Sequence, residues 1–367
     1  MKPFPQFKKL ILSICLLLSA ASFSFAQLSP SRFTPSYGEF FKQAWREKGP
    51  ITAILATSDR LQRDTRIGLA SSHYLRQDGR VHEDIFGLIP QKQPVKSFAL
   101  ESLSPSGEYR YMSEDEDFIK YLIGNGYSSE AVCYLYGSNF APSDSLDYYK
   151  AYSLYSAGAL DRAAKEYSKI LPESSYYEAS LFFGSVCDTY LLDYDSASQR
   201  IQSYSGDQKE LKAYELAGIS LLRNEPESYQ AYSKDFTYSS YLFSEGEKIF
   251  DEIYHSRFEE KRKSPLMAAT LSALIPGLGK IYTGAYGEAI SSFLLWGCST
   301  ALAIDNGLKN GAGDWRTIIF SSISSLLYLG NIYGSYISVG LYYDYLEDAQ
   351  NSTILVNLHI PIRTVFK

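Results

Sequence analysis

The residues "AYSLYSAGALDRAAKEYSKILP", 151–172, decide how the middle of the chain folds, because their small side chains are spaced for two packed helices. A glycine or another small residue is needed where two such helices turn, and Gly158 stands at that point. An alanine is needed where they cross at close range, and Ala163 stands there. The other positions of the pattern are Ala151, Leu154, Leu160, Tyr167 and Pro172. The stretch therefore predicts a pair of short helices joined by a tight turn.

The same pattern recurs along the chain. Alanines are spaced at intervals of 34 residues, at Ala163, Ala197 and Ala231. A looser unit precedes them, with Gly126 and Ala131 at the matching interval of five but offset by two residues. This period resembles that of tetratricopeptide repeats. We therefore expect residues 112–245 to form three to four degenerate units of a helical solenoid, with a concave face that binds a protein partner.

Tyrosine is unusually frequent, with 32 residues, and many lie in or next to the repeats. Two interpretations stay open for them. They fill the cores of the repeats, which is the favoured interpretation for any single ring, or they cluster on the concave face and recognise a peptide. The tyrosines concerned include Tyr148, Tyr149, Tyr152, Tyr155, Tyr176 and Tyr177.

Two long apolar stretches lie near the C-terminus. Residues 285–304 contain one charge and residues 317–341 contain none. A helix of about 20 apolar residues crosses the hydrocarbon core, so both stretches are expected to span a membrane. The polar residues between them, 305–316, are expected to connect them as a hairpin. Gly330 and Gly334 have the spacing that lets a neighbouring helix approach closely.

A shorter apolar piece, residues 266–275, precedes this hairpin and is followed by Pro276 and Gly277, which break a helix. Both a half-helix that turns back at this point and a kinked full span that runs to Tyr282 fit the sequence.

The surrounding segment resembles membrane hairpins of the two-transmembrane domain family, which share a Pro-Gly-x-Gly-x-x-Tyr-x-Gly core. The matching residues of the turn are Pro276, Gly277, Gly279, Tyr282 and Gly284. The resemblance implies membrane residence for residues 261–345. The basic residues at its start are expected to anchor to lipid headgroups. These are Lys261, Arg262 and Lys263.

The N-terminal end has the layout of a secretory signal peptide. Lysines precede an apolar run, and a small-x-small site ends at Ala26. We therefore expect residues 1–26 to be cleaved, the alternative being an uncleaved anchor helix.

The block "SRFTPSYGEFFKQAWREKGP", 31–50, opens the remaining chain. Pro35 fixes a turn, and Ser36 is placed to cap an amphipathic helix. Gly49 and Pro50 end that helix and start a second one. The second helix is expected to continue the apolar face through Ile51, Ile54, Leu55 and Leu61.

Residues 29–68 resemble the YidD family of membrane protein insertion efficiency factors. The matching residues are Arg32, Phe33, Pro35, Phe40, Ala44, Gly49, Arg60 and Arg63. The cysteines of the family are replaced by Ser31, Tyr37 and Asp64, and its closing Gly-Gly-x-Asp-Pro segment is missing. The resemblance implies a short helical domain that assists a membrane-protein insertase at the cytoplasmic face of the inner membrane.

The block is also locally basic in an acidic protein. We expect its basic residues to lie on an anionic membrane surface. The alternative is a helical pair that turns its charges toward water. The residues assigned to the membrane surface are Arg32, Lys42, Arg46, Arg60 and Arg63.

Several classes of function are not expected. The net charge of −6 does not suggest nucleic-acid binding. The sequence "VHED", 81–84, lacks further ligands for a metal, and no nucleophile or phosphate loop stands in a recognisable context. The scattered Cys133, Cys187 and Cys298 are expected to be small buried residues. We therefore expect no catalytic residues, no cofactor and no metal.

Together these features predict a mainly α-helical protein of the bacterial inner membrane. Its parts are a signal peptide (1–26), a YidD-like amphipathic helical domain (27–95), a tetratricopeptide-like α-solenoid (112–245), a transmembrane hairpin (261–345) and a tail (346–367) whose alternation permits a strand. A cleaved signal places the N-terminal domains in the periplasm.

The expected function is a non-enzymatic accessory or adaptor in membrane-protein insertion or envelope assembly. Its partners would be membrane lipid, a protein bound through the repeats, and insertase or envelope-assembly machinery. The alternative is a structural membrane scaffold that binds a protein partner through its repeats. A transporter is disfavoured because the hairpin shows no buried charges along a substrate path.

Overall fold

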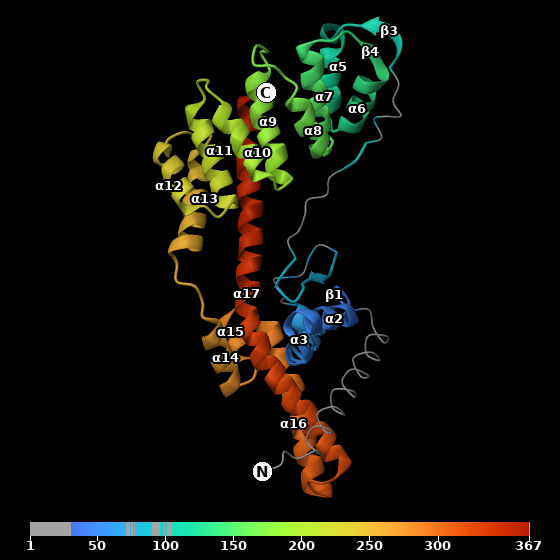
Figure 1. The fold of residues 1–367 in the computed structure, drawn as a ribbon, viewed down its shortest axis with the longest axis vertical. Helices are drawn as coiled ribbons and strands as arrows, with labels where there is room; N and C mark the ends of the chain where they lie inside the picture. Colours follow the sequence, from blue (N-terminus) through green and yellow to red (C-terminus); the bar gives the residue numbers. More distant parts are fainter. Residues whose placement is uncertain are drawn as a thin grey trace. The chain divides into compact units, whose positions relative to one another are not determined.

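The computed structural model describes residues 31–70, 74, 76, 78–89, 96–98, 100 and 105–366. The expected signal peptide, residues 1–26, lies outside the described residues. The chain is mainly helical, with little strand, as its sequence predicts (Figure 1). It forms two compact units that each take two segments of the chain. Unit 1 contains Met1–Pro90 and Lys261–Asp348, and unit 2 contains Gln91–Glu260 and Ala349–Lys367.

The N-terminal block of unit 1 is short and its helices begin and end where local signals predict. It contains β1 (Phe33–Thr34), α2 (Tyr37–Lys48), α3 (Pro50–Arg63), α4 (Arg66–Ala70) and β2 (Val81–His82), and β1 pairs with β2 in parallel. The Ser36 side chain accepts a hydrogen bond from the backbone of Glu39 and so caps α2. Gly49, with φ of 85°, turns the chain into α3 at Pro50.

The hairpin segment folds together with this block in unit 1. It contains α14 (Pro265–Leu274), α15 (Leu278–Tyr282), α16 (Tyr286–Asn310) and the start of α17 (Trp315–Val365). Residues 266–275 do not continue to Tyr282 as one kinked helix, because Pro276 and Gly277, with φ of 92°, separate α14 from α15. The expected polar connection of residues 305–316 shortens to 311–314, since α16 extends to Asn310.

Within the described residues, α16 is the one helix that is long and apolar enough to cross a membrane. The second expected span, residues 317–341, is part of the 51-residue helix α17 and does not reach that apolarity. Its serines, tyrosines and Asn331 lower the hydropathy of the stretch. Of the two stretches expected to span a membrane, one, in α16, therefore meets the requirements of length and apolarity among the described residues.

Helices of unit 2 follow one another as four pairs in the described part of the chain, and each helix contacts the next. The pairs are α5 (Met112–Gly124) with α6 (Ser128–Gly137), α7 (Asp144–Ser156) with α8 (Leu160–Tyr167), α9 (Tyr177–Tyr190) with α10 (Tyr194–Ser203), and α11 (Lys209–Leu222) with α12 (Pro226–Tyr232). The strand β3 (Ser106–Arg110) precedes α5, and β4 (Ser138–Phe140) follows α6. The two strands pair in parallel. The last pair is followed by α13 (Ser244–Tyr254).

A residue with positive φ stands at the turn of every pair. These residues are Gly126 (83°), Gly158 (83°), Leu192 (66°) and Asn224 (58°). Five positions after each turn comes a buried side chain of the second helix, namely Ala131, Ala163, Ala197 and Tyr229. The expected Ala231 is exposed, because the turn of the last pair comes two residues early and brings Tyr229 to this position.

The six tyrosines named in the sequence analysis lie in the core of unit 2 or pack against it, which confirms the favoured interpretation for them. Tyr148 and Tyr149 are buried, and the ring of Tyr148 stacks on that of Tyr176 with centroids 4.5 Å apart. Tyr152 and Tyr155 pack against Phe183. Among the three cysteines of the described residues, by contrast, only Cys187 is buried, while Cys133 and Cys298 are exposed, because α6 and α16 turn these two positions outward.

The tail is helical, so the expectation of a strand is wrong. Residues 349–365 continue α17 without a break. Their buried apolar residues Ile354, Leu358 and Ile362 recur at the spacing of a helix face and not at that of a strand. They join the core of unit 2 with the helices of the pairs, and Figure 1 shows the end of α17 in red beside α9 and α11. The chain's own C-terminal helix therefore covers the face of the helix pairs against which it packs.

Candidate functional site

The helix α3 buries charged side chains where an apolar face was expected. Ile51 is 74% exposed, whereas Asp59, Arg60 and Arg63 are buried. A helix on the surface of a soluble domain has the opposite arrangement. The apolar stripe expected to begin at Ile51 is therefore not the packed face of α3. The C-terminal half of α3 buries polar side chains, and their partners are Glu83, just after β2, and residues of the hairpin.

Three residues form the ionic core of this site. The Arg63 guanidinium donates from Nε to Asp59 Oδ2 at 2.8 Å. It also donates from Nη1 and Nη2 to the two oxygens of Glu83, each at 2.7 Å. Although burial acts to lower the pKa of Arg63, Glu83 and Asp59 raise it well above its ordinary value. Arg63 is therefore held as a cation by two carboxylates.

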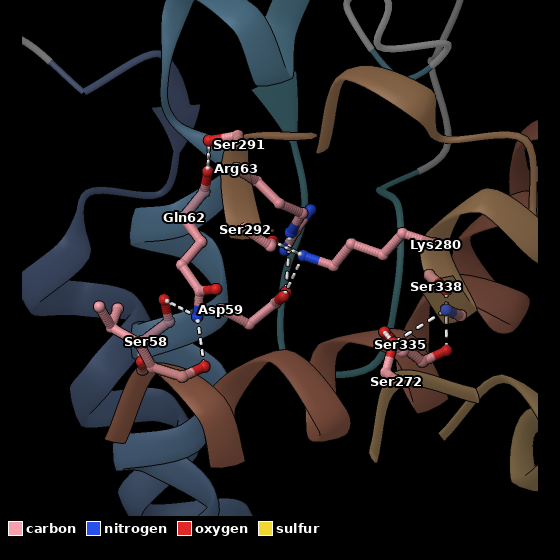
Figure 2. A network of polar contacts seen from close by, with 12 residues as sticks. Ser58, Asp59, Gln62, Arg63, Ser272, Lys280, Ser291, Ser292, Ser335 and Ser338 are labelled. Carbon is pink, nitrogen blue, oxygen red and sulfur yellow. Dashed lines mark hydrogen bonds and ion pairs between the residues drawn. The ribbon is translucent and has the colours of Figure 1, made fainter. Parts of the chain in front are cut away.

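Lys280 connects this core to the hairpin. It is fully buried, and its Nζ lies 2.7 Å from Asp59 Oδ1 and 3.0 Å from Ser292 Oγ. Figure 2 shows the long side chain of Lys280 extending to Asp59 and Ser292. A buried charge is tolerated where it is paired and hydrogen-bonded. Asp59 therefore serves two cations, Arg63 from its own helix and Lys280 from α15.

Small residues of α17 let α3 come close. A Cβ at Gly334 would lie 1.7 Å from Asp59 Oδ1, and a Cβ at Gly330 would lie 2.6 Å from Ser58 Oγ. The two glycines therefore permit the close approach that their spacing predicts. The approaching helix is α3, from the other end of the sequence. Gln62 Nε2 donates to the carbonyl of Leu327 at 3.1 Å across the same contact.

Serine hydroxyl groups form further hydrogen bonds with backbone and side-chain groups of unit 1. Ser291 Oγ of α16 donates to the carbonyl of Gln62 at 2.6 Å. Ser272 of α14 and Ser335 of α17 share a hydrogen bond of 2.6 Å, and Ser272 Oγ also accepts from the backbone of Gly279 (Figure 2). The helices of unit 1 are thus held together by polar contacts between small side chains, as in membrane helix bundles.

Some buried polar atoms in this region have no hydrogen-bond partner among the described residues. They include Thr57 Oγ1, Arg60 Nε and Nη1, Gln62 Oε1, Glu288 Oε2, and both polar atoms of Asn331. Glu288 is 2% exposed and interacts electrostatically with Arg63 and Lys280. A buried polar group that stays without a partner costs stability.

Two of the residues assigned to a membrane surface are buried, so that assignment is wrong for Arg60 and Arg63. The guanidinium carbon of Arg60 lies 4.2 Å from the centroid of the Phe40 ring, and its Nη2 donates to the carbonyl of Pro35 at 2.8 Å. Burial lowers the pKa of Arg60 to about 10, and Glu83 opposes this shift. The other assigned residues of the block are exposed, namely Arg32, Lys42 and Arg46.

The basic triplet and the residues of the turn lie together around α14 and α15. Lys261 and Arg262 are exposed, whereas Lys263 Nζ donates to the carbonyl of Tyr282 at 3.0 Å. A Cβ at Gly279 would lie 2.0 Å from the carbonyl oxygen of Ala268. The other residues of the motif form the turn before α15 or the link after it, namely Pro276, Gly277 and Gly284.

The residues of "VHED" point to different partners. His82 Nε2 lies 2.8 Å from Asp78 Oδ2, Glu83 binds Arg63, and Asp84 Oδ1 accepts hydrogen bonds from the backbone after it. Within the described residues, no three His, Cys, Asp or Glu side chains form a group that could hold a metal ion.

The sequence interpretation missed Asp59, Glu83 and Lys280 as site residues. A lysine inside an apolar hairpin was the available signal, because charges in such segments usually face a polar interior. The expectation that the hairpin lacks buried charges is wrong for the same reason. Comparison of the chain with models of protein families, with curated proteins and with solved structures gave no match.

Proposed function

We propose that the chain is a non-enzymatic adaptor of the bacterial inner membrane that acts in membrane-protein insertion or envelope assembly. Unit 1 anchors it in the bilayer, and unit 2 binds a protein partner. The N-terminal block is exposed on the periplasmic side.

One observation carries this proposal, namely that unit 1 buries charges and exposes large apolar side chains. Asp59, Arg63 and Lys280 are buried, whereas Leu308 is 84% exposed. Further exposed apolar residues of α16 are Ile290, Phe293, Leu294, Leu302 and Ile304. A soluble domain distributes these residues the other way. In a bilayer, charges turn to the bundle interior and apolar side chains face lipid.

A surface on α2 supports contact with lipid headgroups. Phe41, Lys42, Trp45 and Arg46 line a shallow hollow on this helix. Aromatic rings and basic side chains together suit the boundary between an anionic headgroup layer and the hydrocarbon. The resemblance of the block to insertion efficiency factors supports an insertase or assembly machine as the partner class.

Deletion and complementation test the function. Cells without the chain are expected to insert fewer membrane proteins, with recovery when the wild-type chain is restored. Chemical crosslinking in intact cells is expected to recover insertase or envelope-assembly components. Normal insertion after deletion, together with capture of neither class, would contradict the adaptor role.

A second candidate is a structural membrane scaffold in which the YidD-like block only packs. The observation in its favour is the burial of Arg60 and Arg63, which serve the interior of unit 1. Replacing Arg32, Lys42 and Arg46 together by alanine separates the two functions, because these exposed residues serve no such packing. The adaptor predicts reduced membrane-protein yield with unchanged folding, and the scaffold predicts unchanged yield.

A further inference from the structure

The end of α17 and the residue after it, together residues 349–366, lie along the first helices of the pairs in unit 2. Its buried Ile354, Leu358 and Ile362 occupy one helix face at i, i+4 and i+8, and they share a core with residues of α7, α9, α11 and α13. The ring of Phe366 stacks on that of Phe182 from α9, with centroids 5.4 Å apart. One short segment therefore contacts several successive helices.

The surface of unit 2 beneath this segment has space for a leucine side chain at Gly218. A Cβ at Gly218 of α11 would lie 2.5 Å from Leu358 Cδ2 and 3.1 Å from the ring of Phe250 on α13. Any other residue at position 218 would therefore fill the space that the leucine occupies. This gives the surface a specific pocket for one apolar side chain of a helix.

Polar contacts fix the position of the segment at both ends. Arg257, just after α13, donates from Nε to Gln350 Oε1 and from Nη2 to Asn351 Oδ1, each at 2.7 Å. Near the other end, the Tyr155 hydroxyl of α7 hydrogen-bonds to His359. Side-chain amides and an imidazole therefore set the register of the helix on this surface.

The opposite side of the segment faces away from the helix pairs. Val356 is 53% exposed and Ile360 is 54% exposed, and Arg363 is also exposed. The segment thus contacts unit 2 through one face only. That is the way an amphipathic helix lies in the groove of a binding protein.

We propose that the first-helix face of unit 2 is a binding surface for an amphipathic helix of a protein partner, and that residues 349–366 occupy it as an exchangeable ligand of the same chain. The partner helix carries apolar residues at i, i+4 and i+8 and an amide side chain one turn before the first of them. This inference rests on the proposed function, in which unit 2 binds a protein, and adds the surface and the class of partner. Because the segment belongs to the same chain, it competes with a partner intramolecularly, so a partner must displace the segment before it binds.

A labelled peptide of residues 349–366 tests the surface in the full-length chain in detergent. Wild type is expected to bind it at least about tenfold more weakly than a Leu358→Asp, Ile362→Asp variant, whose own segment no longer fits. The matched control is Val356→Asp with Ile360→Asp, on the exposed side of the same helix, which is expected to behave as wild type. If the Leu358 and Ile362 variant keeps its helical circular dichroism and does not bind the peptide, the segment is a permanent part of the core and the proposal is overturned.

Gly218→Val tests the same surface without changing the segment. It is expected to release residues 349–366, seen as faster hydrogen exchange there with unchanged exchange in the helix pairs, and to bind no added peptide. Protection of the segment equal to wild type, or loss of protection throughout unit 2, would overturn the proposal. This measurement decides the question if the Leu358 and Ile362 variant does not fold. Neither experiment depends on the membrane or on an insertase, so failure of the proposed cellular function would leave these results intact.

Discussion

Asp59 is the residue on which the interior of unit 1 depends. One of its oxygens receives Arg63 Nε and the other receives Lys280 Nζ. Removing Lys280 leaves Asp59 paired with Arg63, but removing Asp59 leaves the buried Lys280 with Ser292 as its hydrogen-bond partner and with no hydrogen-bonded carboxylate, although Glu288 still interacts with it electrostatically. The two deletions therefore differ in whether a buried charge loses its directly paired counter-charge.

We accordingly expect Asp59→Ala to lower the free energy of unfolding of unit 1 by about 3–5 kcal/mol. This is the usual cost when one member of a buried ion pair is removed and the other is left without its partner. Lys280→Met is expected to lower the free energy of unfolding by less than Asp59→Ala. Trp45, Trp296 and Trp315 all belong to unit 1, so tryptophan fluorescence during denaturation in micelles reports on this unit. Asp305→Ala, which breaks an exposed pair with Lys309, is the control and is expected to change little. Equal costs for Asp59→Ala and Asp305→Ala would contradict the buried network.

His359 makes the docking of the α17 end sensitive to pH. Burial, and then the nearby Arg363, lower the pKa of His359 below its ordinary value. Tyr155 hydrogen-bonds to the imidazole, and Cys187 lies near Tyr155. Because the folded pKa is below the unfolded one, the neutral imidazole stabilises the docked state at high pH. This contribution is lost as the pH falls below about 6.5 and through the folded pKa.

Hydrogen exchange of residues 349–366 is therefore expected to accelerate between pH 7.5 and pH 5.5, after correction for the intrinsic exchange rate. His359→Gln cannot take up a proton in this range and is expected to remove most of the change. The comparison between the two chains cancels the effects of other titrating groups. An equal acceleration in both would show that His359 is not the responsible group.

At the scale of elements, the contact between α3 and α17 depends on the absence of a side chain. Gly334 faces Asp59, whereas Gly340 of the same helix has no atom within 4 Å of a Cβ placed on it. Glycine to alanine in a helix favours folding by about 1 kcal/mol when there is room. Over-packing a buried contact costs about 1–3 kcal/mol.

Gly334→Ala is therefore expected to lower the melting temperature of unit 1, while Gly340→Ala is expected to leave it unchanged or raise it. The two variants make the same chemical change in the same helix, so their difference isolates the contact with α3. Tryptophan fluorescence on heating in micelles measures both. Equal shifts for the pair would contradict close packing of α3 on α17.

The same elements show how far the sequence predicts the fold. Ser36, Gly49 with Pro50, and Pro276 with Gly277 act within a few residues, so the starts and ends of their helices could be predicted. The pairing of Asp59 with Lys280 joins residues 221 positions apart, and no local pattern identifies it. For α3, the pattern identified a helix, but the face that packs depends on partners supplied by the hairpin.

At the scale of the whole molecule, each unit combines two segments that are far apart in the sequence. The N-terminal block has its ionic partners in the hairpin, and the solenoid has an apolar face that the C-terminal helix covers. Division of the sequence into consecutive domains missed both relations, because composition changes along the chain do not report which segments fold together. The shared helix α17 contributes to each unit in turn.

The native cysteines test how this molecule lies in the membrane. Cys133 is exposed on α6 of unit 2, and Cys298 is exposed near the middle of α16. If unit 2 is periplasmic and α16 is in lipid, a membrane-impermeant maleimide is expected to label Cys133 in spheroplasts, and Cys298 only after detergent is added. Cys133→Ser and Cys298→Ser variants assign each signal.

Labelling of Cys133 only after the inner membrane is opened would place unit 2 in the cytoplasm, where an insertion accessory of the YidD type acts. Rapid labelling of Cys298 in intact membranes would instead remove α16 from the bilayer and contradict the anchoring role of unit 1.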